Sequence, residues 1–229
     1  MVQAVIVAAG RGTRMGPGMD KLFLPVAGRP LIAHTWRRFD DAACIDAIVL
    51  VVREGLQPAF ADLARAYEFH KPHSFVAGGR ERQDSVWNGL LALDATCEIV
   101  AIQDGARACT TAELIAATVH AARETGAAVA AQRISDTVKE SKDGAWIEGH
   151  LDRSRLWTVQ TPQTFRVEVI CRALGVVRER GLTVTDDTAA CELTGQRVRL
   201  VESPEPNPKV TTPADVPGVE LLLRATAAG

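Results

Sequence analysis

The residues with the clearest potential for chemistry lie in the segment QAVIVAAGRGTRMGPGMDK, which covers residues 3–21. Its β-branched run at residues 5–7 predicts a short buried strand. The following positions hold small residues and cations: Ala8, Ala9, Gly10 and Gly12, then Arg14 and Lys21. Glycines let backbone N–H groups turn toward an anion, and open α/β sheets bind phosphates in loops that leave a strand. The segment therefore predicts a cradle for a nucleoside triphosphate, and a basic surface loop is the alternative interpretation.

Two familiar phosphate-binding loops do not fit this segment. A dinucleotide-binding loop, G-x-G-x-x-G, needs a third glycine at the position that Met15 occupies. A Walker A loop needs Gly-Lys followed by Ser or Thr, and no glycine of the segment precedes a lysine in this way.

Two further polar motifs follow later predicted strands. Residues 78–85, GGRERQDS, combine a glycine turn with an Asp-Ser helix start, which could fix polar groups against a base; a simple turn with a capping box is the alternative. Residues 104–107, DGAR, leave a strand opposite the cradle and place Asp104 where a metal or a ribose would bind. The alternative for Asp104 is that it caps the next turn.

The elements that must position these motifs alternate between strand and helix. After the first strand, apolar runs predict strands at 47–52, 74–77, 98–103, 127–132 and 198–202. Helical patterns are predicted at 30–39, 55–67, 85–93, 111–125, 167–180, 187–193 and 214–224. This alternation predicts an α/β fold, Rossmann-like, with a mostly parallel sheet and helices on both faces.

One stretch breaks the alternation. Residues 135–158 contain alternating polar and apolar positions and a Lys142-Asp143-Gly144 turn, which predict short strands in a projecting β-arm. Exposed apolar residues usually meet a partner, so we expect the arm to pack against a second subunit. The whole chain, 1–229, is predicted to form a single domain with the arm as a subdomain.

Composition narrows the class of protein. The chain has 229 residues, 47% of them hydrophobic, and a net charge of −2, which gives no general attraction to nucleic acid or to an anionic membrane surface. The N-terminus lacks a signal-peptide pattern, and no apolar run approaches the length of a membrane span, so the cytoplasm is the expected location. Five dispersed cysteines without a C-x-x-C pair predict reduced core residues rather than disulfides or a zinc site.

The run A-A-G-x-G-x-R-M followed by a lysine resembles the pyrophosphorylase-type nucleotidyltransferases. Later elements narrow the resemblance to cytidylyltransferases that act on small alditol phosphates, most closely the methylerythritol-phosphate cytidylyltransferases: D-T at 136–137, D-R at 152–153, T-P-Q at 161–163, T-D at 185–186 and K-V-T at 209–211. The resemblance implies transfer of CMP from CTP to 2-C-methyl-D-erythritol 4-phosphate, with release of pyrophosphate, in the non-mevalonate synthesis of isoprenoid precursors. The alternatives are the same transfer to ribitol 5-phosphate, and a non-catalytic relative that binds nucleotide.

The resemblance also implies roles for individual residues. Arg14 and Lys21 would stabilise the transition state, with Mg²⁺ held mainly by the CTP phosphates. The implied CTP contacts are Ala8, Ala9, Gly10, Gly12, Gly79, Asp84, Ser85, Asp104 and Gly105. The implied contacts to the alditol phosphate are Asp104, Arg107, Thr137, Arg153, Thr161, Thr185 and Lys209. Arg153 and Lys209 would orient the acceptor phosphate, and Arg153 would arrive on the arm of the partner in a homodimer.

Three positions depart from the pattern of the family. Asp20 stands before Lys21 in place of the usual proline, and Pro208 replaces a branched apolar residue before Lys209. Gln103 precedes Asp104 where the family typically has a histidine. These departures concern the positioning of substrates more than the binding of CTP.

Overall fold

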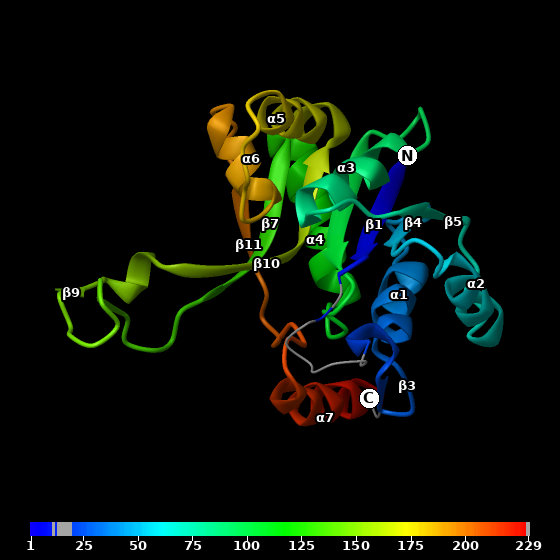
Figure 1. Cartoon of the computed structure of the whole chain (residues 1–229), viewed down its shortest axis with the longest axis horizontal. Coiled ribbons are helices and arrows are strands. Elements are labelled where there is room, and N and C mark those ends of the chain that lie inside the picture. The colour runs from blue at the N-terminus through cyan, green and yellow to red at the C-terminus, as the bar shows by residue number, and fades with distance from the viewer. Residues whose placement is uncertain (11, 13–19, 228–229) are drawn as a thin grey trace.

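The computed structural model describes residues 1–10, 12 and 20–227. One seven-stranded sheet forms its centre, in the order β11 (Arg199–Glu202), β7 (Ala127–Arg133), β10 (Trp157–Arg166), β6 (Ile99–Asp104), β1 (Val2–Ala8), β4 (Ala47–Val52) and β5 (His73–Ala77). β10 runs antiparallel to both of its neighbours, and the other pairings in the sheet are parallel (Figure 1). The predicted α/β class with a mostly parallel sheet is therefore confirmed.

Helices cover both faces of the sheet because the strands are apolar on both sides. On one face lie α1 (Leu31–Asp41), α2 (Gln57–Ala66) and α4 (Ala112–Thr125). The C-terminal α7 (Val216–Ala227) packs against the short strand β2 (Pro25–Val26), beyond the end of the sheet (Figure 1). On the other face lie α3 (Arg82–Leu91), α5 (Val167–Glu179) and α6 (Asp187–Leu193). Among the described residues, no helix has the length and apolar character needed to cross a membrane, and the cytoplasmic location stays a prediction.

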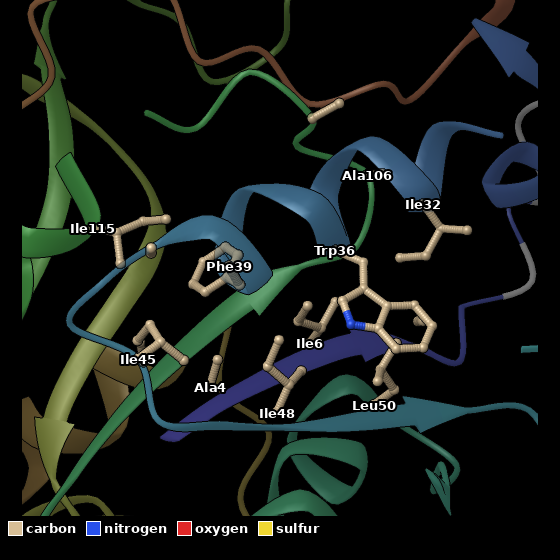
Figure 2. Packing of buried hydrophobic residues seen from close by; sticks show 14 of the residues in the cluster. Ala4, Ile6, Ile32, Trp36, Phe39, Ile45, Ile48, Leu50, Ala106 and Ile115 are labelled. Carbon is tan, nitrogen blue, oxygen red and sulfur yellow. The ribbon is translucent and has the colours of Figure 1, made fainter. Parts of the chain in front are cut away.

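The alternation of side chains along a strand divides the core into two clusters. Ala4 and Ile6 of β1 point to one face, where they meet Trp36 and Phe39 of α1 (Figure 2). Val5, between them, points to the other face and belongs to the second cluster. Burial on both faces fixes the register of β1, and with it the place where the chain leaves the sheet.

A small hairpin leads into α1. In the chain it follows the glycine-rich residues 8–18, which we call the glycine segment. It begins with the 3₁₀ turn η2 (Lys21–Phe23) and continues as β2 (Pro25–Val26) and β3 (Arg29–Pro30). Ala27 and Gly28 turn the hairpin with positive φ angles of 46° and 80°, which suit the tight turns of two-residue hairpins.

Several predicted boundaries are confirmed and others are wrong. The strand at 47–52 and the helix at 187–193 have the predicted limits. α3 begins at Arg82, three residues earlier than predicted, because a capping box starts the helix at Glu81. The predicted arm also ended too late: the strand that begins at Trp157 enters the central sheet and continues to Arg166.

The predicted arm extends away from the body of the molecule (Figure 1). Its regular structure is sparser than predicted and consists of β8 (Lys139–Glu140), β9 (Gly149–His150) and the 3₁₀ turn η3 (Arg153–Arg155). Trp146 and Ile147 are 76% and 72% exposed, so the apolar tip of the arm is uncovered in the single chain.

Candidate active site

A cavity of about 470 Å³ opens at the carboxyl ends of β1 and β6. Its walls come from the end of β1, the loop before α3 and the first turns of α3, the end of β6, η2 and the segment that carries Lys209. β4 pairs with one side of β1, and the later strand β6 pairs with its other side. The order of the strands therefore reverses at β1. Open α/β sheets bind ligands where the strand order reverses in this way.

Glycine is required where the loop after β5 approaches β1 and α3. A Cβ atom on Gly78 would overlap the side chain of Ala9, and one on Gly79 would overlap Asp84. The N–H of Gly79 donates to Ser85 Oγ at 3.0 Å, which fixes the loop on the helix. Ala9, Gly79 and Ser85, three of the predicted CTP contacts, line the cavity together.

Asp84 holds the start of α3. Its carboxylate accepts the N–H of Glu81 at 3.0 Å and so forms one half of the capping box. The capping interpretation of the Asp-Ser motif is therefore confirmed for Asp84. Ser85 accepts the N–H of Gly79 and also lines the cavity.

Asp104 occupies the end of β6 and is held by two cations. Its Oδ1 accepts from Arg82 Nε at 3.1 Å, and its Oδ2 lies 2.6 Å from Lys209 Nζ. Arg82 also reaches Asp187 at the start of α6, with 2.9 Å between Nη1 and Oδ2. Two buried carboxylates and two partly exposed cations from four distant segments thus form one network.

The pKa values in this network follow from burial and pairing. Burial alone would raise the pKa of Asp104, but the charges of Arg82 and Lys209 outweigh it and hold that pKa well below its usual range. Burial alone would lower the pKa of Arg82, but its two carboxylate partners raise it. Asp187 is wholly buried, and burial raises its pKa despite Arg82. The site therefore holds Asp104 ionised at neutral pH.

Lys21 lies at the edge of the cavity, where the sequence predicted a catalytic cation. Its Nζ donates to the backbone carbonyl of Val210 at 3.1 Å, which joins η2 to the Lys209 segment. Gly12 has a φ of +61°, and a Cβ there would lie 3.3 Å from Lys21 Cγ, so the glycine gives the lysine stem room. Arg14, the other predicted catalytic cation, lies outside the described residues.

A polar network behind Asp104 fixes the end of β6. The N–H of Asp104 donates to Thr161 Oγ1 at 3.1 Å, and Asn207 Nδ2 donates to the carbonyl of Thr161 at 2.9 Å. Arg107 Nη1 donates to the carbonyl of Asn207 at 2.6 Å. Gln103 donates to Thr110 Oγ1 at 2.9 Å. Thr161 is buried, so in this chain it orients Asp104 rather than lining the cavity.

The remaining predicted residues have different surroundings. Gly105 lines the cavity, and a Cβ there would press on the carbonyl of Val7; Ala8 is buried as the last residue of β1. Arg153 lies on the arm and donates to the carbonyl of Ser135 on the opposite leg. Thr137 on the arm and Thr185 before α6 are exposed, and neither lines the cavity of its own chain.

Sequence reasoning missed two charged members of the site. Arg82 stood inside the quoted GGRERQDS motif, and Asp187 directly follows the T-D element at 185–186. Their meeting depends on α5, against which both α3 and α6 pack, and no local pattern reports this arrangement. Each residue could have been noticed as an additional charge in or beside a motif that was already quoted.

The sequence matches the family model described as 2-C-methyl-D-erythritol 4-phosphate cytidylyltransferase over residues 2–225. Enzymes of this name from Geobacillus thermodenitrificans and Caldanaerobacter subterraneus subsp. tengcongensis are 41% and 40% identical to the chain. These alignments cover 99% and 97% of the chain, and 98% and 99% of the relatives. The structure is similar to that of 4-diphosphocytidyl-2C-methyl-D-erythritol synthase from Anaerococcus prevotii, with a TM-score of 0.86 and 28% identity over 97% of this chain and 96% of that one.

Proposed function

Because the chain belongs to the 2-C-methyl-D-erythritol 4-phosphate cytidylyltransferase family, we propose that the cavity between β1 and β6 is where CTP and the acceptor phosphate react. The chain is a cytidylyltransferase. It transfers the cytidylyl group of CTP to 2-C-methyl-D-erythritol 4-phosphate, in the non-mevalonate synthesis of isoprenoid precursors.

The chemistry requires charge compensation more than a general base. A phosphate monoester has a second pKa of about 6, so the acceptor is already a nucleophile near neutral pH. Negative charge builds up at the α-phosphorus and on the departing pyrophosphate, and fixed cations stabilise it. We assign this role to Lys21 at the cavity edge and to Arg14, which precedes it in the sequence.

CTP is proposed to occupy the part of the cavity between the glycine segment and α3. The backbone at Ala9 and Gly10 provides N–H groups at the end of β1, with Gly12 beyond them. Gly79 and Ser85 lie opposite, where fixed polar groups could select a base by its edge.

The acceptor is proposed to bind beside Asp104 and Lys209. The ammonium of Lys209 suits a phosphate dianion, and the ionised carboxylate of Asp104 suits a hydroxyl or ribose donor. Arg107 is largely buried behind this position, where burial lowers its pKa without removing its charge. Thr185, exposed before α6, does not line this cavity in the single chain, so no acceptor contact is assigned to it.

Mg²⁺ is proposed to enter with CTP. Among the described residues, no group of three or more His, Cys, Asp and Glu side chains could hold a metal ion. The Asp104 carboxylate is already engaged by Arg82 and Lys209. The phosphate oxygens of CTP would thus supply most ligands, and the ion would neutralise charge on the triphosphate.

We further propose a homodimer in which each arm completes the site of the other subunit. Arg153 and Thr137 lie on the arm, and neither lines the cavity of its own chain. The exposed Trp146 and Ile147 give the arm an apolar surface that a second copy would cover. A guanidinium delivered in this way could bind the acceptor phosphate with two N–H groups.

The observation that carries the proposal is the meeting of Lys21, Asp104 and Lys209 at one cavity, although almost 190 positions separate the two lysines. Lys21→Ala should lower kcat for pyrophosphate release by about 10²-fold or more, as the loss of a transition-state donor does. The KM for CTP should change less. Unchanged kcat in this variant would contradict the proposal. In a separate control on the acceptor, the wild-type enzyme should turn over ribitol 5-phosphate more slowly than 2-C-methyl-D-erythritol 4-phosphate.

A further inference from the structure

Asp20 uses both oxygens of its carboxylate to hold the turn that carries Lys21. Oδ1 accepts the N–H of Leu22 at 3.1 Å and caps η2. Oδ2 forms an ion pair with Arg53. The capping contact and the ionic contact therefore belong to different atoms and can be removed separately.

Arg53 connects this turn to the rim of the central sheet. It directly follows β4, whose last residue, Val52, pairs with Ala8 at the end of β1. The side chains of Arg53 and Asp20 are 30% and 21% exposed, so solvent screens their pairing only in part. The Nε of Arg53 is buried and has no hydrogen-bond partner among the described residues, which leaves the guanidinium dependent on its contact with Asp20.

The two ends of Lys21 are held by different parts of the chain. Its ammonium donates to the carbonyl of Val210, and its backbone begins the turn that Asp20 caps. A single 3₁₀ turn of three residues has poor hydrogen-bond geometry and little stability of its own. Buried Leu22 and Phe23, which packs edge-on against Phe60, hold the apolar side of the turn, and the ion pair to Arg53 holds its polar side.

We propose that the Asp20–Arg53 ion pair is a positioning device for Lys21, which sets where the ammonium stands when the transition state forms. This inference rests on the proposed function, in which Lys21 stabilises that state. Asp20 and Arg53 are positioning residues, because they act through the turn. Misplacement of a catalytic group by about 1 Å can cost up to about 10²-fold in rate, so a partial loss of kcat is expected.

The test compares Asp20→Asn, Arg53→Gln, the double variant and Arg53→Lys. Asparagine keeps an oxygen that can cap η2 but removes the charge. Each of the first two variants should lower kcat by about tenfold, with the KM for CTP within about twofold of wild type. The double variant should be no worse than either single one, and Arg53→Lys should recover part of the loss. Thermal unfolding midpoints should remain near that of the wild type.

Asp62→Asn is the matched control, because Asp62 forms an ion pair with Arg65 on the exposed surface of α2. This variant should keep the wild-type kcat. Wild-type kcat in Asp20→Asn, or losses that multiply in the double variant, would overturn the positioning role. Lys21→Ala separates the two proposals: if it loses kcat while Asp20→Asn and Arg53→Gln do not, the positioning inference alone fails, and if it keeps kcat, the proposed function fails.

Discussion

Arg82 is the residue on which the charge balance of the cavity depends. Its guanidinium contacts Asp104 at the end of β6 and Asp187 at the start of α6. A buried carboxylate is costly unless a cation and hydrogen bonds compensate it. Asp187 is wholly buried, and one of its oxygens has no hydrogen-bond partner among the described residues, so Arg82 supplies most of its compensation. The Arg82–Asp187 ion pair therefore serves to assemble the site as well as to stabilise the fold.

Removing this guanidinium should be costly and dependent on pH. In Arg82→Gln we expect the free energy of unfolding to fall by about 3–5 kcal/mol, because a buried charge is left without its partner. Burial raises the pKa of Asp187, and a carboxyl group whose pKa is raised by folding loses its contribution to stability as the pH rises through that pKa. Urea unfolding should therefore show a larger deficit at about pH 8 than at about pH 5.

The matched control for this prediction is Arg82→Gln combined with Asp187→Asn. Removing the orphaned carboxylate should recover a substantial part of the lost stability and flatten its pH dependence. Equal stability of the single and double variants at both pH values would contradict the account of Arg82.

At the scale of elements, the loop before α3 is shaped by close approach. Gly78 touches Ala9 of the glycine segment, and Gly79 lies directly against the backbone of Asp84. The capping box at Glu81 and Asp84 fixes the start of α3 beside them. Because the helix start and the loop share these contacts, a small change in the loop alters one wall of the cavity.

Gly79→Ala should weaken CTP binding and the fold together. The added Cβ cannot fit unless the loop or α3 moves, so we expect a KM for CTP about tenfold higher and a stability loss of about 1–3 kcal/mol. Steady-state kinetics and urea unfolding measure the two effects. Gly175→Ala in α5 is the control, since a Cβ there meets nothing within 4 Å and alanine favours a helix. Gly79→Ala with unchanged kinetics would contradict this view of the loop.

At the scale of the whole molecule, the proposed homodimer rests on the projecting arm. Its two legs contact each other through Arg153 and the carbonyl of Ser135, and Arg133 stacks over Trp157 at its base, 4.3 Å from the ring centre. These contacts hold the two legs of the arm together, while the apolar residues at its tip stay exposed. A braced arm with an uncovered tip is suited to reach a second subunit.

Mixing two inactive variants tests whether Arg153 acts in its own chain or in its partner. Lys21→Ala and Arg153→Ala are each expected to lose activity as homodimers. If the arm serves the partner, a mixed dimer has one site with both side chains intact, and random reassortment should restore about a quarter of the wild-type activity. If Arg153 serves its own chain, no mixed site is intact and activity stays low, which would contradict the shared site.

Local patterns in the sequence determined most of the fold and several residues that line the cavity. Continuous apolar runs such as residues 47–52 are specific to buried strands, and glycines after the first strand are a local requirement of the loop. The limits of the strand at 47–52 and of the helix at 187–193, and the presence of the projecting arm, followed from such patterns. For the same reason Lys21, Gly79, Ser85, Asp104 and Lys209 could be predicted, and the structure brings them to one cavity.

Only the tertiary structure decided which distant residues share the site. β10 lies antiparallel between β6 and β7. Its own sequence does not specify these partners. Arg82 meets Asp187 across 105 positions, and Asp20 meets Arg53 across 33. Such pairings arise when buried surfaces bring whole elements together, so packing determines them and local periodicity does not report them.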